Sequence, residues 1–134
     1  ASANLTYDDS INELYVNGNA NIATAVLVGD TTIQWGGVTT TSTGANQTIA
    51  SLSTTGITGI EFLVKGVDSG GKYSVATVQA VTDGTNVDYS TFATVNLGGY
   101  TGSLAVNISG GYVRLQVTPS SGNSTVWVTQ ARTI

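Results

Sequence analysis

The chain has 134 residues and a mass of 13.6 kDa, the size of one domain that can bury a core without disulfide bonds. Only 9% of the residues are charged, the net charge is −4 and the four basic residues are scattered, which argues against a nucleic-acid partner. The lack of His and Cys excludes Ser-His-Asp catalysis, thiol nucleophiles and His- or Cys-ligated metal sites. No apolar run approaches the roughly 18 residues of a membrane helix, so membrane insertion is not expected.

Residues 1–19 are predicted to form an N-terminal strand or arm, and residues 20–134 a single β-sandwich domain. The segment NLTYDDSINELYVNGN gathers three of the eight acidic residues and is typical of a strand, a turn and a second strand. Two interpretations stay open. The segment is the first hairpin of the domain's own sheet, or it adds a strand to the sheet edge of a neighbouring copy. In the second case, its anchors are the apolar residues Leu5, Tyr7, Ile11, Leu14 and Val16.

The first half of the domain is predicted to be less regular than the second. Residues 20–28 have the apolar composition of a buried strand. Residues 36–48 are polar, contain glycine and show little periodicity, which predicts a long loop or an edge. Residues 49–52 are predicted to resume ordered structure. Residues 59–67 alternate with period two, so one face of this strand is predicted to be buried through Ile60, Phe62 and Val64.

Strand and turn signals follow one another closely in the second half. Residues 72–81 form a long apolar-rich run, which predicts a central strand covered on both faces. Asp83-Gly84 predicts a hairpin with a type I′ turn into a return strand over residues 87–97. Residues 103–118 are predicted to form a tight hairpin, and residues 124–134 a final strand. The pattern predicts an all-β fold, an antiparallel sandwich or jelly roll of roughly eight to ten strands.

Few residues carry a signal for chemistry. Glu13 and Glu61 are the only glutamates, and no spacing ties them into the carboxylate pair of a glycosidase, so the chain is predicted not to be an enzyme. Asp83, Asn86 and Asp88 could offer oxygen ligands to Ca²⁺. We favour a hairpin turn there, because Asp-Gly has its own structural reason to occur between two strands. No cofactor is expected.

Two groups of surface residues are candidates for binding or modification. Exposed aromatic side chains stack on sugars, and the candidates for contact with a glycan or receptor are Trp35, Tyr100 and Tyr112. Trp127 is expected to pack in the core instead. Four N-x-[ST] sequons predict glycan attachment where the chain meets a glycosylating pathway, and they lie at Asn4, Asn46, Asn107 and Asn123.

The chain resembles the β domains of bacteriophage tail fibres and virion appendages. The pattern L-x-Y-D-x-x-x-N-x-L-x-V-x-G-N is similar to a short β unit of tail-fibre proteins, and its positions here are Leu5, Tyr7, Asp8, Asn12, Leu14, Val16, Gly18 and Asn19. The segment from residue 59 onward is similar to domains of marine phage and cyanophage virion proteins, with its GG turns, its DG turn and VRLQVTP. The resemblance implies a structural or attachment module without catalytic residues, and oligomers that are often trimers.

The leading hypothesis is a non-enzymatic structural subunit of an extracellular fibre, filament or virion appendage. It would self-assemble by β-strand addition and sheet-edge contacts, as a trimer or a helical filament. The alternative is a carbohydrate- or receptor-binding module at a fibre tip, with a cell-surface glycan as its partner. Low charge with abundant Thr, Asn and Gly is consistent with an extracellular or virion-surface location.

Overall fold

The structure is a computed structural model that describes residues 5–8, 10, 13–16, 25–28 and 31–134. All regular elements in these residues are β-strands, so no helix in the described part of the chain is suited to cross a membrane. In chain order they are β1 (Leu5–Asp8), β2 (Glu13–Val16), β3 (Ala25–Val28), β4 (Thr31–Thr40), β5 (Gln47–Ser53), β6 (Gly59–Asp68), β7 (Lys72–Thr82), β8 (Val87–Leu97), β9 (Gly102–Ser109), β10 (Tyr112–Pro119) and β11 (Thr125–Thr133).

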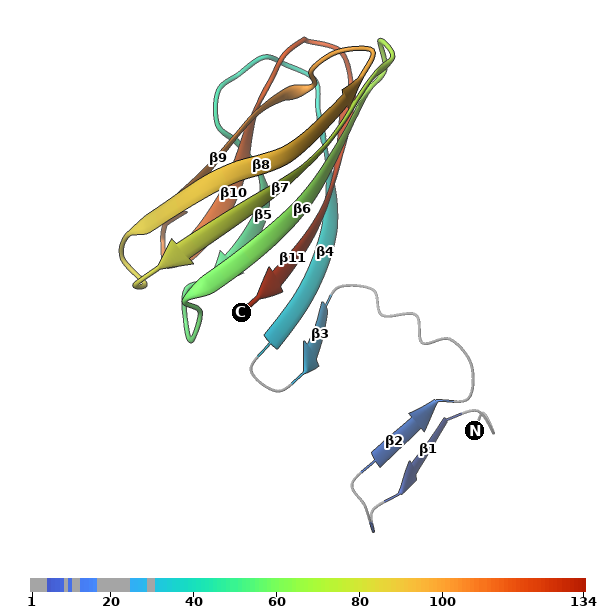
Figure 1. The fold of residues 1–134 in the computed structure, drawn as a ribbon, viewed down its shortest axis with the longest axis vertical. Coiled ribbons are helices and arrows are strands. Elements are labelled where there is room, and N and C mark those ends of the chain that lie inside the picture. Colours follow the sequence, from blue (N-terminus) through green and yellow to red (C-terminus); the bar gives the residue numbers. More distant parts are fainter. Residues whose placement is uncertain (1–4, 9, 11–12, 17–24, 29–30) are drawn as a thin grey trace.

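The strands form a two-layer antiparallel sandwich and a separate hairpin sheet (Figure 1). One layer has six strands in the order β3-β4-β11-β6-β7-β8, and the other has three in the order β5-β10-β9. Strands β1 and β2 pair only with each other. The predicted antiparallel sandwich is therefore confirmed, and the nine strands of its two layers fall within the predicted number.

The core lies between the two layers and is built from the alternating inner residues of both. Strand β6 buries Ile60, Phe62 and Val64, as the period-two pattern predicts. Trp127 on β11 is 2% exposed, and its Nε1 donates a 2.9 Å hydrogen bond to Thr40 Oγ1. A Cβ placed on Gly66 would lie only 2.6 Å from the Trp127 ring. The indole therefore occupies the space that a side chain at position 66 of the neighbouring strand β6 would need.

The segment 36–48 is more ordered than its composition predicts. Residues 36–40 continue β4, which pairs with β11 along its length, from Ile33 opposite Arg132 to Thr40 opposite Thr125. Only residues 41–46 connect β4 to β5. The prediction of a long loop was wrong because the strand is induced by pairing with a partner some ninety residues away, and local patterning does not record such pairing. The alternative prediction of an edge is confirmed, because β3 pairs only with residues 31–34 and leaves residues 36–40 without a described partner on their other side.

Strand β7 is not covered on both faces. Its inner residues Ser74, Ala76, Val78, Ala80 and Thr82 are buried, while the residues between them are half-buried or exposed. Strand β6 beside it, and β11 beyond β6, alternate in the same way. The apolar composition of residues 72–81 therefore leaves an apolar outer surface on the six-stranded sheet.

The two hairpins close by different turns. Gly110 and Gly111 join β9 to β10, and both have positive φ, of 59° and 78°, as a type I′ turn requires. Between β7 and β8 the hairpin is confirmed, but the two-residue type I′ turn at Asp83-Gly84 is not. The connection spans residues 83–86, and only Gly84 has positive φ there.

Candidate functional site

The N-terminal segment pairs within its own chain. Leu5 lies opposite Val16, and Tyr7 lies opposite Leu14, so these four predicted anchors occupy positions on a single face of the β1–β2 sheet. Ile11 lies outside the described residues. The intermolecular role of this arm, and the division of the chain into residues 1–19 and 20–134, remain predictions.

Strand β8 is a long open edge of the sandwich. It pairs with β7 on one side over eleven residues and with no described strand on the other. Residues 88–97 are exposed throughout. Ala93 has a φ of 51°, and the β7–β8 register shifts beside it, which marks a β-bulge. An edge of this length presents unpaired backbone groups to which another strand can add.

The outer surface of the six-stranded sheet carries the largest set of exposed apolar side chains. Three successive rows cross β11, β6, β7 and β8, as the pairing registers show. We call their apolar members the open face: Leu63, Val67, Tyr73, Val75, Phe92, Val95, Leu97, Val126 and Val128. No described element packs on it, and exposures reach 68% at Val95 and 71% at Leu97.

The open face has a depression at one end and a polar boundary at the other. The depression has a volume of about 210 Å³ and lies between the side chains of Lys65, Val67, Tyr73, Ser74, Val75, Val95 and Leu97. At the opposite boundary, Arg132 Nη2 lies 2.9 Å from Glu61 Oε1. Gln79 Nε2 donates a 3.4 Å hydrogen bond to Glu61 Oε2. Sequence reasoning missed this surface, although the apolar run at residues 72–81 was its signal.

The predicted aromatic contacts do not converge on one surface. Trp35 lies in β4 opposite Gln130 and is half-buried, so it is not part of an irregular loop. Tyr100 precedes β9 and is 47% exposed, while Tyr112 begins β10 and is 50% exposed. The length of β9, roughly 25 Å for eight residues, separates the two tyrosines along the sandwich.

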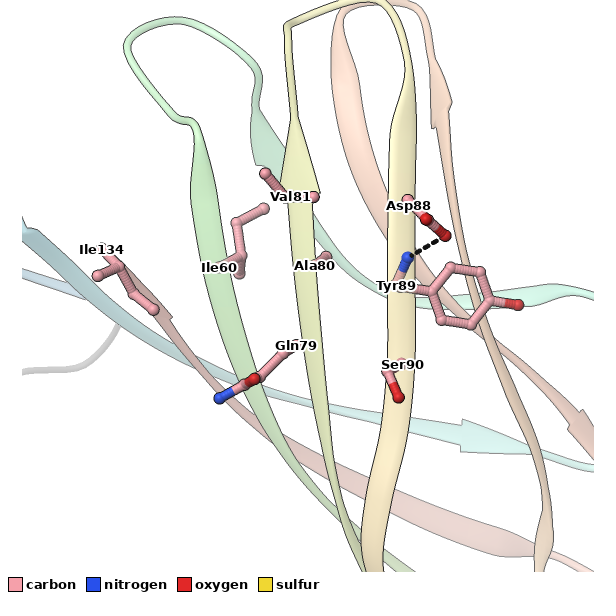
Figure 2. Close-up of a pocket in the computed structure, with 8 residues that line it drawn as sticks. All are labelled: Ile60, Gln79, Ala80, Val81, Asp88, Tyr89, Ser90 and Ile134. Carbon is pink, nitrogen blue, oxygen red and sulfur yellow. Dashed lines mark hydrogen bonds between the residues drawn. The ribbon is translucent and has the colours of Figure 1, made fainter.

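A further depression lies on β6, β7 and β8 near the C-terminus (Figure 2). Its volume is about 400 Å³, and its polar lining consists of Gln79, Asp88 and Ser90. In Figure 2 the Tyr89 ring points away from Gln79 and Ile134, so it does not form a stacking wall beside them. The lining of the depression is mostly apolar, with the three polar side chains among Ile60, Ala80, Val81 and Ile134.

The loop proposed for Ca²⁺ uses its oxygens internally. Asp83 Oδ1 accepts hydrogen bonds from the N–H groups of Asn86 at 2.6 Å and Thr85 at 2.8 Å, and Oδ2 accepts one from Asn86 Nδ2 at 2.9 Å. The backbone and side-chain donors of Asn86, followed by the Thr85 N–H, lower the pKa of Asp83 to about 2. Asp88 Oδ1 accepts from the N–H of Tyr89. The described residues contain no cluster of three or more acidic side chains.

A buried carboxylate that the sequence did not single out joins two loops. Asp68, at the end of β6, is 2% exposed. Its carboxylate accepts hydrogen bonds from Ser121 Oγ, from Gly70 N at 2.5 Å and from Asn123 Nδ2 at 3.0 Å. The Ser121 hydroxyl is the main cause that lowers the pKa of Asp68, although burial opposes it. These bonds connect the β6–β7 turn with the loop before β11.

The remaining candidate residues are dispersed. Glu61 lies in β6 and Glu13 in β2, two different sheets, and the structure does not describe the Glu13 side chain. Asn46 lies in an exposed loop. Asn107 Oδ1 accepts from Arg114 Nε, and Asn123 Nδ2 donates to Asp68, so the amides of two sequons already have partners. Asn4 lies outside the described residues.

Comparison with known proteins finds a similar fold within a phage tailspike structure. No protein-family model matches this sequence, and no curated protein does. The structure is similar to the tailspike protein of Acinetobacter baumannii phage AM24, with a TM-score of 0.52 and 13% identity. A tailspike of A. baumannii bacteriophage Fri1, a capsular polysaccharide depolymerase, aligns with a TM-score of 0.46 and 12% identity. The similarities cover 78% and 82% of this chain, but only 26% and 19% of the tailspikes. At the level of fold, the likeness to phage-appendage β domains is confirmed.

Proposed function

We propose that this chain is a non-enzymatic structural module of an extracellular phage appendage and that it assembles with copies of itself. The observation that carries the proposal is the combination of an open apolar sheet face with an unpaired edge strand, β8. Ordinary monomeric domains cover or shorten their edge strands, and they keep their exposed apolar patches small. The fold shared with a tailspike domain supports the appendage context.

The described residues also offer little to catalysis. Glu61 is held by Arg132, Asp83 by its own loop, and Asp68 by three donors in a buried network. The engagement of these three carboxylates by other groups supports a non-catalytic role. A structural role uses the features that the surface does present.

The proposed assembly joins the N-terminal arm of one copy to the β8 edge of the next. Main-chain hydrogen bonds would supply affinity, and the alternating side chains of Leu5, Tyr7, Leu14 and Val16 would fix the register. A head-to-tail contact of this kind forms a ring or a filament, according to the rotation between copies.

Sedimentation velocity on the full chain and on a variant that lacks residues 1–18 tests this function. We expect the full chain to form species larger than a dimer, and the deletion to stop that growth while far-UV circular dichroism still reports a β fold. A full chain that stays monomeric at about 100 μM, well above the Kd of a micromolar contact, would overturn the proposal. An unchanged size distribution after deletion would remove the arm from it.

A carbohydrate-binding module is the second candidate, and the depression in Figure 2 is the observation that favours it. Gln79, Asp88 and Ser90 present an amide, a carboxylate and a hydroxyl to solvent, groups that can hydrogen bond to sugar hydroxyls. Retention of the protein on immobilised glycans, lost in Asp88→Asn, would support this role. Quenching of tryptophan fluorescence with and without glycan tests whether Trp35 takes part.

A further inference from the structure

We propose that the open face is the interface with a second copy of this chain, packed open face to open face. The inference deepens the proposed self-assembly by naming a contact distinct from the N-terminal arm and the β8 edge. The dimer would have four layers, with the six-stranded sheets of the two copies packed against each other in the middle. Strand β7 would then be covered on both faces, as its apolar composition predicts.

The size of the surface suits a weak contact between copies. Strands lie about 4.8 Å apart and same-face residues about 6.6 Å apart, so three rows over four strands cover roughly 380 Å². A patch of that size lies in the range of the largest apolar patches that monomers expose, which are often functional. Two facing patches would bury roughly 760 Å² together, below the standard size of an interface and in the range of weak contacts.

The charges on this surface argue against other partners. Lys65 is the only charged residue within the three rows, and the Arg132–Glu61 pair lies at their boundary. A nucleic acid or an anionic lipid surface requires a cluster of basic residues, which the described residues do not place here. The aliphatic stem of Lys65 can remain packed against Val75 and Val128 while its ammonium group reaches the rim.

The open face has protruding side chains with a depression between them, a shape that suits packing against another sheet. Two sheets pack about 10 Å apart when the side chains of their facing surfaces interdigitate. Tyr73 and Leu97 stand beside the depression of about 210 Å³, with Val75 and Val95 along its wall. The depression is a hole for a large apolar side chain, and the same face of a second copy supplies such side chains.

Two substitutions on one strand test the inference in the full chain. Val75 and Gln79 both point outward from β7, but Val75 lies within the open face and Gln79 at its polar boundary. We expect Val75→Lys to raise the Kd of the dimer about tenfold or more, and Gln79→Lys to change it less than about twofold. Val75→Thr keeps a β-branched side chain and is expected to weaken the dimer with no loss of fold, as circular dichroism would check.

Sedimentation equilibrium separates the outcomes. If wild type is monomeric, the proposed self-assembly itself fails. If wild type assembles and the dimer Kd of Val75→Lys is no higher than that of Gln79→Lys, the protein self-assembles but the open face is not the interface. The deletion of residues 1–18 is expected to leave a dimer. If that deletion abolishes the dimer as fully as Val75→Lys does, the occupant of the open face is the N-terminal hairpin, and the inference is overturned.

Discussion

Gly66 packs directly against the Trp127 ring in the core of the sandwich. A methyl group on Gly66 would lie 2.6 Å from the ring and 2.7 Å from Thr101 Oγ1, and both neighbours are buried. We expect Gly66→Ala to lower the free energy of unfolding by about 1–3 kcal/mol through overpacking, as urea denaturation would measure. Gly122→Ala is the matched control, because a Cβ there meets nothing within 4 Å. Equal stability of the two variants would contradict this account of Trp127.

Asp68 makes folding stability depend on pH in a defined window. The Ser121 hydroxyl and the other donors lower the pKa of Asp68 from its usual 3.8, so the ionised form is favoured in the folded state. Its contribution is complete above the unfolded pKa and is lost as pH falls through the lower, folded pKa. We expect Asp68→Asn to lower stability at pH 7, and the difference from wild type to shrink below about pH 4.

Chemical denaturation at a series of pH values measures this dependence for Asp68→Asn. Asp88→Asn serves as the control, because Asp88 is exposed and bonds only to the N–H of the next residue among the contacts described. A difference between wild type and Asp68→Asn that stays constant from pH 7 to pH 2 would show that the carboxylate charge is not what joins the two loops.

At the scale of elements, local alternation was sufficient where a strand and its partner are adjacent in sequence. The pattern predicted β6 with its buried face, the return strand β8 over Val87–Leu97, and the β9–β10 hairpin. Each of these depends on period-two burial or on a glycine turn, which short windows record. Gly110 and Gly111 are the clearest case, because both adopt the positive φ that the turn requires.

Local patterning failed where the cause of a structure lies far away in sequence. Strand β4 extends through residues 36–40 because β11 pairs with it, and its own polar residues do not show this. The apolar outer residues of β7 led to the prediction that both faces of this strand are buried, but no described element of this chain packs on its outer face. For the candidate site, the sequence indicated apolar excess but could not show that Val126, Val67, Tyr73 and Leu97 meet in one row.

At the scale of the whole molecule, the inner faces of the two sheets pack against each other, whereas no described element packs on the outer face of the six-stranded sheet. The inner surfaces of both sheets meet in a core that contains Phe62, Leu115 and Trp127, each at most 2% exposed. The outer surface of the six-stranded sheet carries apolar residues on which no described element packs. The proposed association of two copies would add stability, since burial of apolar area contributes to folding and to binding alike.

Thermal unfolding therefore depends on concentration if two copies share the open face. A dimer unfolds to two separate chains, so mass action raises the midpoint as the protein concentration increases. For a domain of this size, we expect the Tm of wild type to rise by about 3 °C for each tenfold increase in concentration. The Tm of Val75→Lys is expected to rise less over the same range, because only the contact between the N-terminal arm and β8 remains, while that of Gln79→Lys follows wild type. A Tm of wild type that is independent of concentration up to about 100 μM, where contacts of micromolar Kd are populated, would show that the open face has no second copy to bind.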